Sequence, residues 1–434
     1  MVFLQLAIVL AAIFLGARLG SIGIGFAGGL GVLVLALMGV RPGDIPIDVI
    51  LIIMSVISAI AAMQVAGGLD YLVSLAEKLL RKKPKYITYL APLVTYFMTI
   101  MAGTGHTAFS TLPVIAEVAK EQGIRPSRPL SIAVVASQVA ITASPISAAV
   151  VYFSKIMQPL GVDYLQILLI CIPTTLLAVI LTSFITNFLG KDLKDDPVYQ
   201  ERLKSGLVQL RGGGNIKILP HAKRSVWIFL AAIIAVMCYA TLISDKVGFV
   251  SPKNIILPRN DAIMAFMLTA ATAIAFLCKI EAANVLSAST FKSGMSACVC
   301  VLGVAWLGTT FVNAHTAEIN MLTGGLLRNY PWLLAVILFF AATLLYSQAV
   351  TAKALMPMAI TMGAAPVALV ASFAAVSALF ILPTYPTLLA AVEMDDTGST
   401  RIGKFVFNHP FIIPGTLTLF FSVLFGFIWG KIVL

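Results

Sequence analysis

Long apolar stretches recur along the whole chain and constrain its fold more than any other feature of the sequence. They run for about 18 to 27 residues, long enough for a helix to cross a hydrocarbon core of roughly 30 Å and too long for barrel strands. Of the 434 residues, 60% are hydrophobic and 11% are charged, and the mean hydropathy is +1.00. Soluble domains are much less apolar. The sequence therefore predicts an all-α polytopic membrane protein, whose first stretch is a spanning helix and not a secretory signal.

Basic residues set the expected orientation in the membrane. The net charge is +11, and the segments 77–86 (EKLLRKKPKY) and 190–224 are rich in lysine and arginine. Loops of this kind remain on the cytoplasmic side. Their charges favour contact with lipid headgroups, and we expect no nucleic-acid partner. With both segments inside, the alternation of helices places the N- and C-termini on the outer side.

Two segments are predicted to enter and leave the membrane on the same side. Residues 86–122 contain the glycine-rich turn GTGHTAFSTLP, and their flanks hold basic residues that belong in the cytoplasm. Residues 331–363 form a second apparent hairpin, entered from the outer side. Such re-entrant backbone is tolerated only where protein or a water-filled cavity satisfies the freed N–H and C=O groups. We therefore expect both hairpins inside the bundle.

A weak internal repeat relates the two hairpins. HTAFSTLPVIAEV (106–118) aligns with VTAKALMPMAITM (350–362), and ASPISAAVV (143–151) aligns with TYPTLLAAV (384–392). The alignment predicts two inverted repeats, 1–189 and 225–434, joined by a cytoplasmic linker, 190–224. Each repeat holds one hairpin and one proline-broken helix. Secondary transporters use inverted repeats with discontinuous helices to build a site near the midplane.

The four predicted chain breaks gather the polar residues of these apolar segments. A helix that begins inside the membrane presents free N–H groups and the positive end of its dipole, which favours an anion. Two such pockets suit a small dianion with a negative group at each end. The candidate substrate-binding residues are Gly103, Thr104, Gly105, His106 and Thr107 at the first tip, Ser347, Gln348, Thr351 and Lys353 at the second, and Thr142, Ser144, Ser147, Thr384, Tyr385 and Thr387 at the broken helices.

Individual members of this set also have structural interpretations. Lys353 contacts the substrate, reaches the outer interface along its own stem, or bonds carbonyls freed at the hairpin tip. His106 has the ordinary pKa range for proton coupling, but a hydrogen-bonded polar side chain explains it equally well. Single hydroxyl groups in membrane helices often bond only to their own helix. The clustering at breaks is the stronger indication.

The remaining motifs predict neither a cofactor nor a metal. The cysteines lie in or beside apolar stretches without metal-ligand spacing, and RGGGN (211–215) lacks the lysine and serine of a phosphate-binding loop. No nucleophile and base occur at a catalytic spacing, so we expect no enzyme. Asp70 and residues 313–320 (NAHTAEIN) are expected to be solvated. Residues 394–404 (MDDTGSTRIGK) are expected to form a cytoplasmic gate-side loop or a docking patch.

Several long motifs, in order along the chain, resemble the anaerobic C4-dicarboxylate transporter (Dcu) family. They include GARLGSIGIGFAGGLG, GTGHTAFSTLPVIAEVAKEQ, SQAVTAKALMPMA and ILPTYPTLLAAVEMDDTG, and the resemblance is closest to the A-type member. It implies a bacterial inner-membrane carrier with periplasmic termini that exchanges fumarate, malate or aspartate for succinate, or takes up dicarboxylates with cations. It also implies membership of the ion transporter superfamily, a homodimer, and an elevator-type arrangement of scaffold and transport domains.

The leading expectation is thus a C4-dicarboxylate carrier whose partners are small dicarboxylates and membrane lipids. A sodium-coupled carrier of other organic anions is an alternative within the same class. An anion channel, or a membrane sensor that recruits a partner through the 394–404 segment, is an alternative from a different class.

Overall fold

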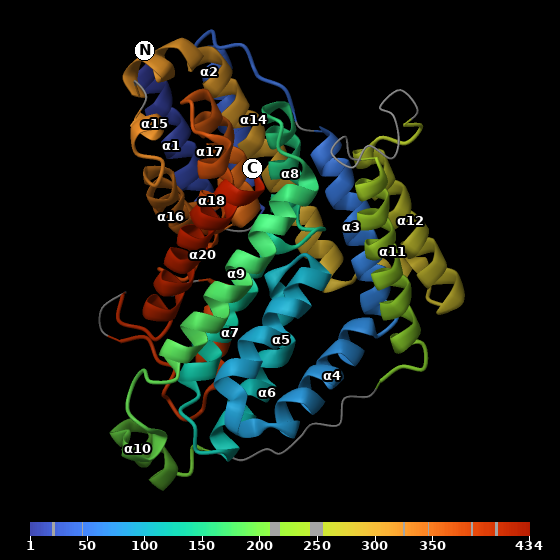
Figure 1. The fold of residues 1–434 in the computed structure, drawn as a ribbon, viewed down its shortest axis with the longest axis vertical. Helices are drawn as coiled ribbons and strands as arrows, with labels where there is room; N and C mark the ends of the chain where they lie inside the picture. The colour runs from blue at the N-terminus through green and yellow to red at the C-terminus, as the bar shows by residue number, and fades with distance from the viewer. Residues whose placement is uncertain are drawn as a thin grey trace.

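The described part of the chain is entirely helical. The structure is a computed structural model that describes residues 1–19, 22–45, 47–208, 218–243, 255–323, 326–345, 347–382, 385–403 and 407–434. No strand occurs among these residues, which confirms the prediction of an all-α protein. The N- and C-termini lie in the upper half of Figure 1, and α10 (Pro197–Lys204) of the predicted linker lies at the opposite end.

Five helical stretches of the described residues are long and apolar enough to cross a membrane. These stretches are Ser127–Leu160, Tyr164–Thr186, Ala222–Leu242, Asn260–Leu277 and Ile412–Val433. A bent pair of helices, α3 (Ile47–Val65) and α4 (Gly68–Lys82), gives a sixth candidate span. The bend is 69° and is made at Gly67, whose φ of +81° favours glycine. The chain is a multi-pass membrane protein, and α4 matches the expected amphipathic segment with its exposed Asp70.

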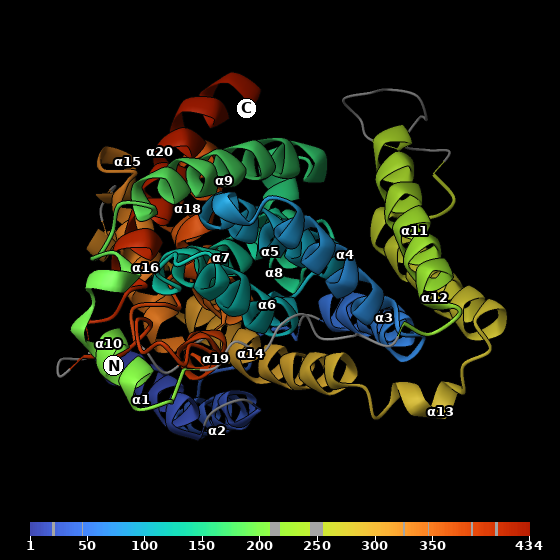
Figure 2. The ribbon, with the colours of Figure 1, turned by 90° about the horizontal axis from the view of Figure 1, so that it is seen from below.

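One group of helices comes from the beginning of each half of the chain. It contains α1 (Val2–Leu19), α2 (Gly23–Leu37), α3, α4, α11 (Ala222–Leu242), α12 (Arg259–Leu277) and α14 (Ser289–Thr323). Helix α14 packs against α2 and α3, and α12 packs against α3 and α11. Figures 1 and 2 both show α11 and α12 side by side at one edge of the molecule, next to α3. We call this set the opening-helix group.

The contact between α2 and α14 is made by backbone against backbone. A Cβ atom on Gly303 would lie 1.9 Å from the carbonyl oxygen of Gly25, and one on Gly28 would lie 2.4 Å from the carbonyl carbon of Gly303. Small residues of this kind let membrane helices approach closely. Close packing matters there because lipid is as apolar as the helices, so no hydrophobic driving force brings them together. Beside this crossing, Leu307 and Phe311 of α14 form a small core with residues of α1 and α2.

The second group holds the hairpins and the interrupted helices. Its first half comprises α5 (Ile87–Ala102), α6 (Ala108–Glu121), α7 (Ser127–Val139), the 3-10 turn η3 (Ala140–Ala143), α8 (Ala148–Met157) and α9 (Tyr164–Thr186). Its second half comprises α16 (Leu333–Leu345), α17 (Gln348–Thr361), α18 (Pro366–Ser372), the 3-10 turn η7 (Phe373–Ser377), α19 (Pro386–Met394) and α20 (Ile412–Val433). The element order is the same in both halves. We call this set the broken-helix group.

Short elements complete the fold. They are the 3-10 turns η1 (Pro84–Tyr86), η2 (Gly105–Thr107), η4 (Gln158–Leu160) and η5 (Leu193–Asp195) and the helices α13 (Ala282–Val285) and α15 (Leu326–Asn329). Within the segments predicted as hairpins, α5 ends at Ala102 and α6 begins at Ala108, while α16 ends at Leu345 and α17 begins at Gln348. Each segment thus contains two separate helices. The inverted relation between the two halves stays a prediction.

Helix α14 corrects the expectation for residues 313–320. The sequence predicts a helix near 293–312 followed by a solvated loop, whereas α14 continues to Thr323 with a kink at His315. His315 is buried, and its Nε2 forms a hydrogen bond with Oε1 of Gln5 in α1. The prediction of solvated residues is wrong for His315, because α1 supplies a packing surface and a polar partner that are not adjacent in sequence. It is confirmed for Asn313, Ala314, Ala317 and Glu318, which are exposed.

Candidate functional site

The first hairpin tip lies against the end of α7. Helix α5 ends at Gly103, whose φ is +66°, and η2 leads into α6. A Cβ atom on Gly105 would lie 3.2 Å from the backbone oxygen of Ser137, so this glycine permits a close approach to α7. The hydroxyl of Thr107 donates to the carbonyl of Thr104 and lies 3.2 Å from the hydroxyl of Thr99. The side chain of His106 lies outside the described part of the chain.

The first broken helix is interrupted between η3 and α8. Thr142 donates to the carbonyl three residues earlier (2.7 Å), and Ser144 donates to the carbonyl of Ile100 in α5 (2.7 Å). Ser147 donates to the carbonyl of Ile141 (2.6 Å) and accepts the amide of the third residue of α8 (3.2 Å). These three hydroxyls therefore satisfy backbone groups freed by the break, as the structural interpretation of single hydroxyls predicts.

The second hairpin begins α17 with a capping serine. Ser347 accepts the amide of Val350 (3.3 Å), and its carbonyl accepts the hydroxyl of Thr351 (2.8 Å). Gln348, in the first turn, donates through Nε2 to the backbone oxygen of Gln138 in α7 (3.2 Å). The first turn of α17 thus lies against the last turn of α7.

Lys353 is buried in α17 at 1% exposure. Its Nζ lies 5.6 Å from the ring centroid of Tyr152 in α8, within the distance of a cation–π contact. The interpretation that the Lys353 side chain extends to the outer interface is therefore wrong. A lysine at the centre of a bilayer costs about 2.5 to 3.5 kcal/mol, so a buried lysine in a membrane protein is a candidate functional residue.

The second broken helix resumes at α19. Thr384 lies outside the described residues, and Tyr385, at the cap position of α19, is half-buried. Thr387, in the first turn, is buried, and its Oγ1 lies 3.5 Å from Nε2 of Gln138. The start of α19 therefore reaches the same point of α7 as the start of α17.

Gln138 and Ser377 are the two residues of this cluster that sequence reasoning missed. The backbone oxygen of Gln138 accepts the side chain of Gln348 (3.2 Å) and the hydroxyl of Ser377 in η7 (3.1 Å). The tip at Gly105 touches the neighbouring residue of α7. All four breaks thus meet at the end of α7. The available signal was a polar residue in the last turn before a break, in the sequence SQVAITASP.

Aromatic packing also joins the two broken helices. The rings of Phe153 in α8 and Phe373 in η7 are stacked with a centroid distance of 4.2 Å and an angle of 14°. Both side chains are fully buried. Such a pair stabilises by about 0.5 to 1.5 kcal/mol beyond its area burial. It holds the two interruptions in register with each other.

In the described part of the 394–404 segment, residues 394–403, Asp395 and residues 397–400 are buried, whereas Arg401 and Ile402 are exposed. The buried carboxylate of Asp395 accepts the amide of Thr397 (3.0 Å), the amide of Thr400 (2.6 Å) and the hydroxyl of Ser399 (2.8 Å). Ser399 in turn accepts the amide of Ser127 at the start of α7 (3.0 Å). This carboxylate organises its own loop, and the resulting burial argues against the docking-patch alternative. The gate-side loop stays a prediction.

Ion pairs tie the same loop to both halves of the chain. Nζ of Lys120 in α6 lies 3.0 Å from carboxylate oxygens of both Asp396 and Glu117. In the linker, Asp196 pairs with Arg125 at 2.6 Å. Burial by itself raises the pKa of Asp196, but a hydrogen bond from the Val198 amide and the bond and charge of Arg125 outweigh it, and the pKa lies below its ordinary value.

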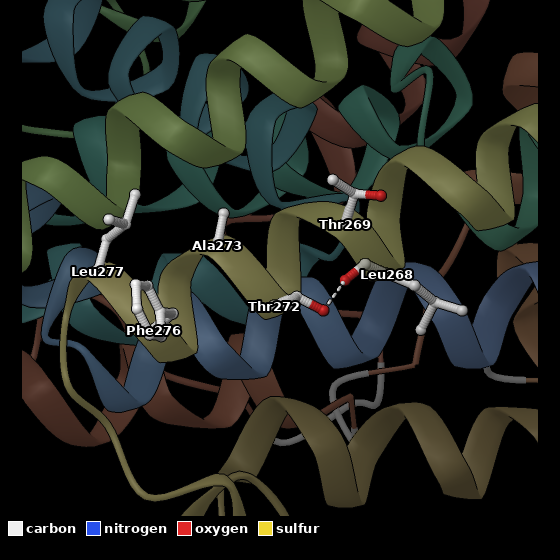
Figure 3. Close-up of a pocket in the computed structure, with 6 residues that line it drawn as sticks. All are labelled: Leu268, Thr269, Thr272, Ala273, Phe276 and Leu277. Atoms are coloured by element: carbon white, nitrogen blue, oxygen red, sulfur yellow. Dashed lines mark hydrogen bonds between the residues drawn. The ribbon is translucent and has the colours of Figure 1, made fainter.

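A surface hollow on α12 is not part of this cluster. Figure 3 shows its lining, which comes from one face of the helix: Leu268, Thr269, Thr272, Ala273, Phe276 and Leu277. The hydroxyl of Thr272 donates to the carbonyl of Leu268 (2.9 Å), so it is already satisfied. None of the six lining side chains is charged, which suits a lipid-facing surface better than an anion site.

No metal site is found in the part of the chain that the structure describes. Within those ranges, no group of three or more histidine, cysteine, aspartate or glutamate side chains could hold a metal ion. Cys171, Cys278 and Cys298 are buried in helix contacts, as expected of packing residues. Cys238 is exposed, and the side chain of Cys300 lies outside the described residues.

The fold and the buried polar cluster define a multi-pass membrane protein of the transporter class. Two solved structures share the fold, each at 14% identity. MtrF of Neisseria gonorrhoeae, from a class of antimetabolite efflux pumps, has a TM-score of 0.57 and covers 86% of this chain and 80% of its own. The YdaH transporter of Alcanivorax borkumensis has a TM-score of 0.54 and covers 88% and 85%.

The chain belongs to the anaerobic C4-dicarboxylate membrane transporter family, whose match spans residues 1–434. It is 66% identical to the C4-dicarboxylate transporter DcuA of Wolinella succinogenes and 61% identical to that of Escherichia coli K12, over 100% of each chain. Identity to the anaerobic C4-dicarboxylate transporter DcuB of Escherichia coli O6:H1 is 37%, over 98% of each chain. The A-type resemblance is confirmed, and the family consists of transporters, not enzymes.

Proposed function

We propose that this protein is a secondary carrier of C4-dicarboxylates, among them fumarate, succinate, malate and aspartate, in the bacterial inner membrane. The observation that carries the proposal is the meeting of four chain breaks at the end of α7, close to the buried Lys353. Helices α17 and α19 both start there. Amides at helix starts and one ammonium group complement the carboxylates of a dianion. Relatives at 61–66% identity carry the name C4-dicarboxylate transporter.

The cluster binds the dicarboxylate largely through neutral donors. A carrier must remove water from its substrate and yet release it on the other side. Amides and hydroxyls hold carboxylates less tightly than paired arginines do. The first turns of α17 and α19 provide amides, and Lys353 provides the single buried ammonium group among the candidate residues that the structure describes. This balance favours turnover over tight retention.

The proposed transport cycle is an elevator movement of the broken-helix group past the opening-helix group. Two observations support it. Contacts are dense within each group, and the major contact between the groups is that of α17 with α14. There, a Cβ atom on Gly308 would lie 3.7 Å from the Cα atom of Ala354, which is an ordinary van der Waals distance. The two halves, 1–189 and 225–434, are then inverted repeats joined by the linker 190–224, with the linker cytoplasmic and both termini periplasmic. The carrier works as a homodimer through the opening-helix group.

Counterflow in proteoliposomes tests the proposed function. Vesicles containing the purified protein and loaded with succinate should accumulate labelled fumarate or aspartate, with saturable kinetics. Vesicles without protein, and protein-containing vesicles without internal succinate, serve as controls. Absence of counterflow for every C4-dicarboxylate would refute the proposal. Uptake that requires a sodium gradient and accepts other organic anions equally would support the alternative carrier, and unsaturable current would indicate a channel.

A further inference from the structure

The side-chain oxygen of Gln138 is a buried acceptor without a donor. Gln138 is 1% exposed, and its Oε1 has no hydrogen-bond partner among the residues that the structure describes. The rest of the residue is occupied: Nε2 is directed at Thr387 (3.5 Å), and the backbone oxygen accepts Gln348 and Ser377. A buried polar atom left unpaired is costly. Such an atom, at the point where the four breaks meet, is a candidate acceptor for a ligand.

The other groups of the cluster are donors. Lys353 offers an ammonium group, and the first turns of α17 and α19 offer amides. The carboxylates of a dicarboxylate only accept hydrogen bonds, so they match these donors and cannot satisfy Gln138 Oε1. A donor carried on the carbon chain between the carboxylates can. Malate carries a hydroxyl at C2 and aspartate an ammonium group, whereas succinate and fumarate carry no donor there.

We propose that Gln138 is a specificity-determining residue, whose Oε1 accepts a hydrogen bond from the C2 hydroxyl or ammonium group of the transported dicarboxylate. The inference rests on the proposed function and deepens it. A site built to hydrogen-bond a substrate group discriminates strongly against analogues that lack the group, because its buried partner is then left unpaired. Substrates with a C2 donor are therefore favoured by this residue over succinate and fumarate.

Competition experiments on Gln138→Met test the assignment. Methionine has a similar length and no carboxamide. In proteoliposomes, unlabelled aspartate, malate and succinate compete with labelled fumarate. The apparent affinities for aspartate and malate should fall about tenfold relative to that for succinate, the loss expected for one buried hydrogen bond. Gln138→Glu keeps an acceptor and should retain the preference for aspartate.

The ratio of affinities separates this role from a structural one. Ser372→Ala, in α18, removes another buried side-chain oxygen that has no partner in the described ranges, and it should leave the aspartate-to-succinate ratio unchanged. An unchanged ratio in Gln138→Met, or equal losses for all three competitors, overturns the assignment. Gln138→Asn gives a second variant, with a smaller shift in the same direction. Wild-type protein without any counterflow would refute the proposed function instead.

Discussion

At the scale of single residues, the charged side chain and the hydroxyl groups of the site have different roles. The hydroxyls of Thr142, Ser144, Ser147 and Thr351 already bond to backbone carbonyls, so each mainly stabilises an interrupted helix. Lys353 differs from them because it brings a full positive charge to a buried position beside Tyr152. We therefore assign electrostatic attraction of the substrate chiefly to Lys353 and to the helix starts.

Substitution of Lys353 tests this division. Lys353→Met should lower the apparent affinity for every dicarboxylate by about 10-fold or more, since hydrogen bonds to charged groups contribute about 1.5 to 3 kcal/mol. Thr107→Ala and Thr351→Ala should weaken transport less, because their hydroxyls are locally bonded. Competition assays with purified protein measure these effects. Lys431→Met, at an exposed site in α20, is the control. Unchanged affinity in Lys353→Met would exclude this residue from the site.

At the scale of elements, the sequence predicted the interruptions well and their partners poorly. Glycine and proline chemistry is local, so the break at Gly103 and the start of α19 at Pro386 could be read from the chain. The burial of His315 against Gln5 could not, because the contact joins α14 to α1. Gln138 was missed for the same reason: its partners come from three distant elements.

The ion pairs on the linker side are predicted to stabilise the fold unequally. Lys120→Met leaves the carboxylates of Glu117 and Asp396 facing each other in a largely buried position. Breaking a buried pair costs about 3 to 5 kcal/mol, so the melting temperature in detergent should fall clearly. Asp192→Asn removes a pair whose carboxylate is 60% exposed, and it should change the melting temperature little. Equal effects of the two substitutions would contradict this ranking.

At the scale of the whole molecule, the opening-helix group and the broken-helix group are held together by different contacts. The opening-helix group is held by the backbone contacts of Gly25, Gly28 and Gly303 and by a core of its own. The large core that surrounds α7 holds the broken-helix group and also contains residues of α3, α4, α11 and α12. Between them, α14 and α17 meet at Gly308 and Ala354 with ordinary spacing. The two groups are therefore also packed against each other, along α3, α4 and α14, and the proposed movement has to take place across these contacts.

Adjacent glycines of α2 provide a matched test of this packing. Gly28→Ala places a methyl group 2.4 Å from the backbone of Gly303, so it should destabilise the protein or reduce its recovery as folded material. Gly29→Ala meets no atom within 4 Å, and alanine favours a helix by about 1 kcal/mol over glycine, so it should be neutral or stabilising. Thermal unfolding of both variants measures the difference. Tolerance of alanine at both positions would refute the proposed contact.

Where the backbones of Gly25 and Gly303 touch, no side chain lies between α2 and α14 that could change its rotamer. These helices therefore cannot approach each other more closely during a cycle. A pair of spectroscopic labels on the outward faces of α2 and α14 would serve as an internal ruler. Changes in the distance from either label to the broken-helix group would then report the displacement of that group.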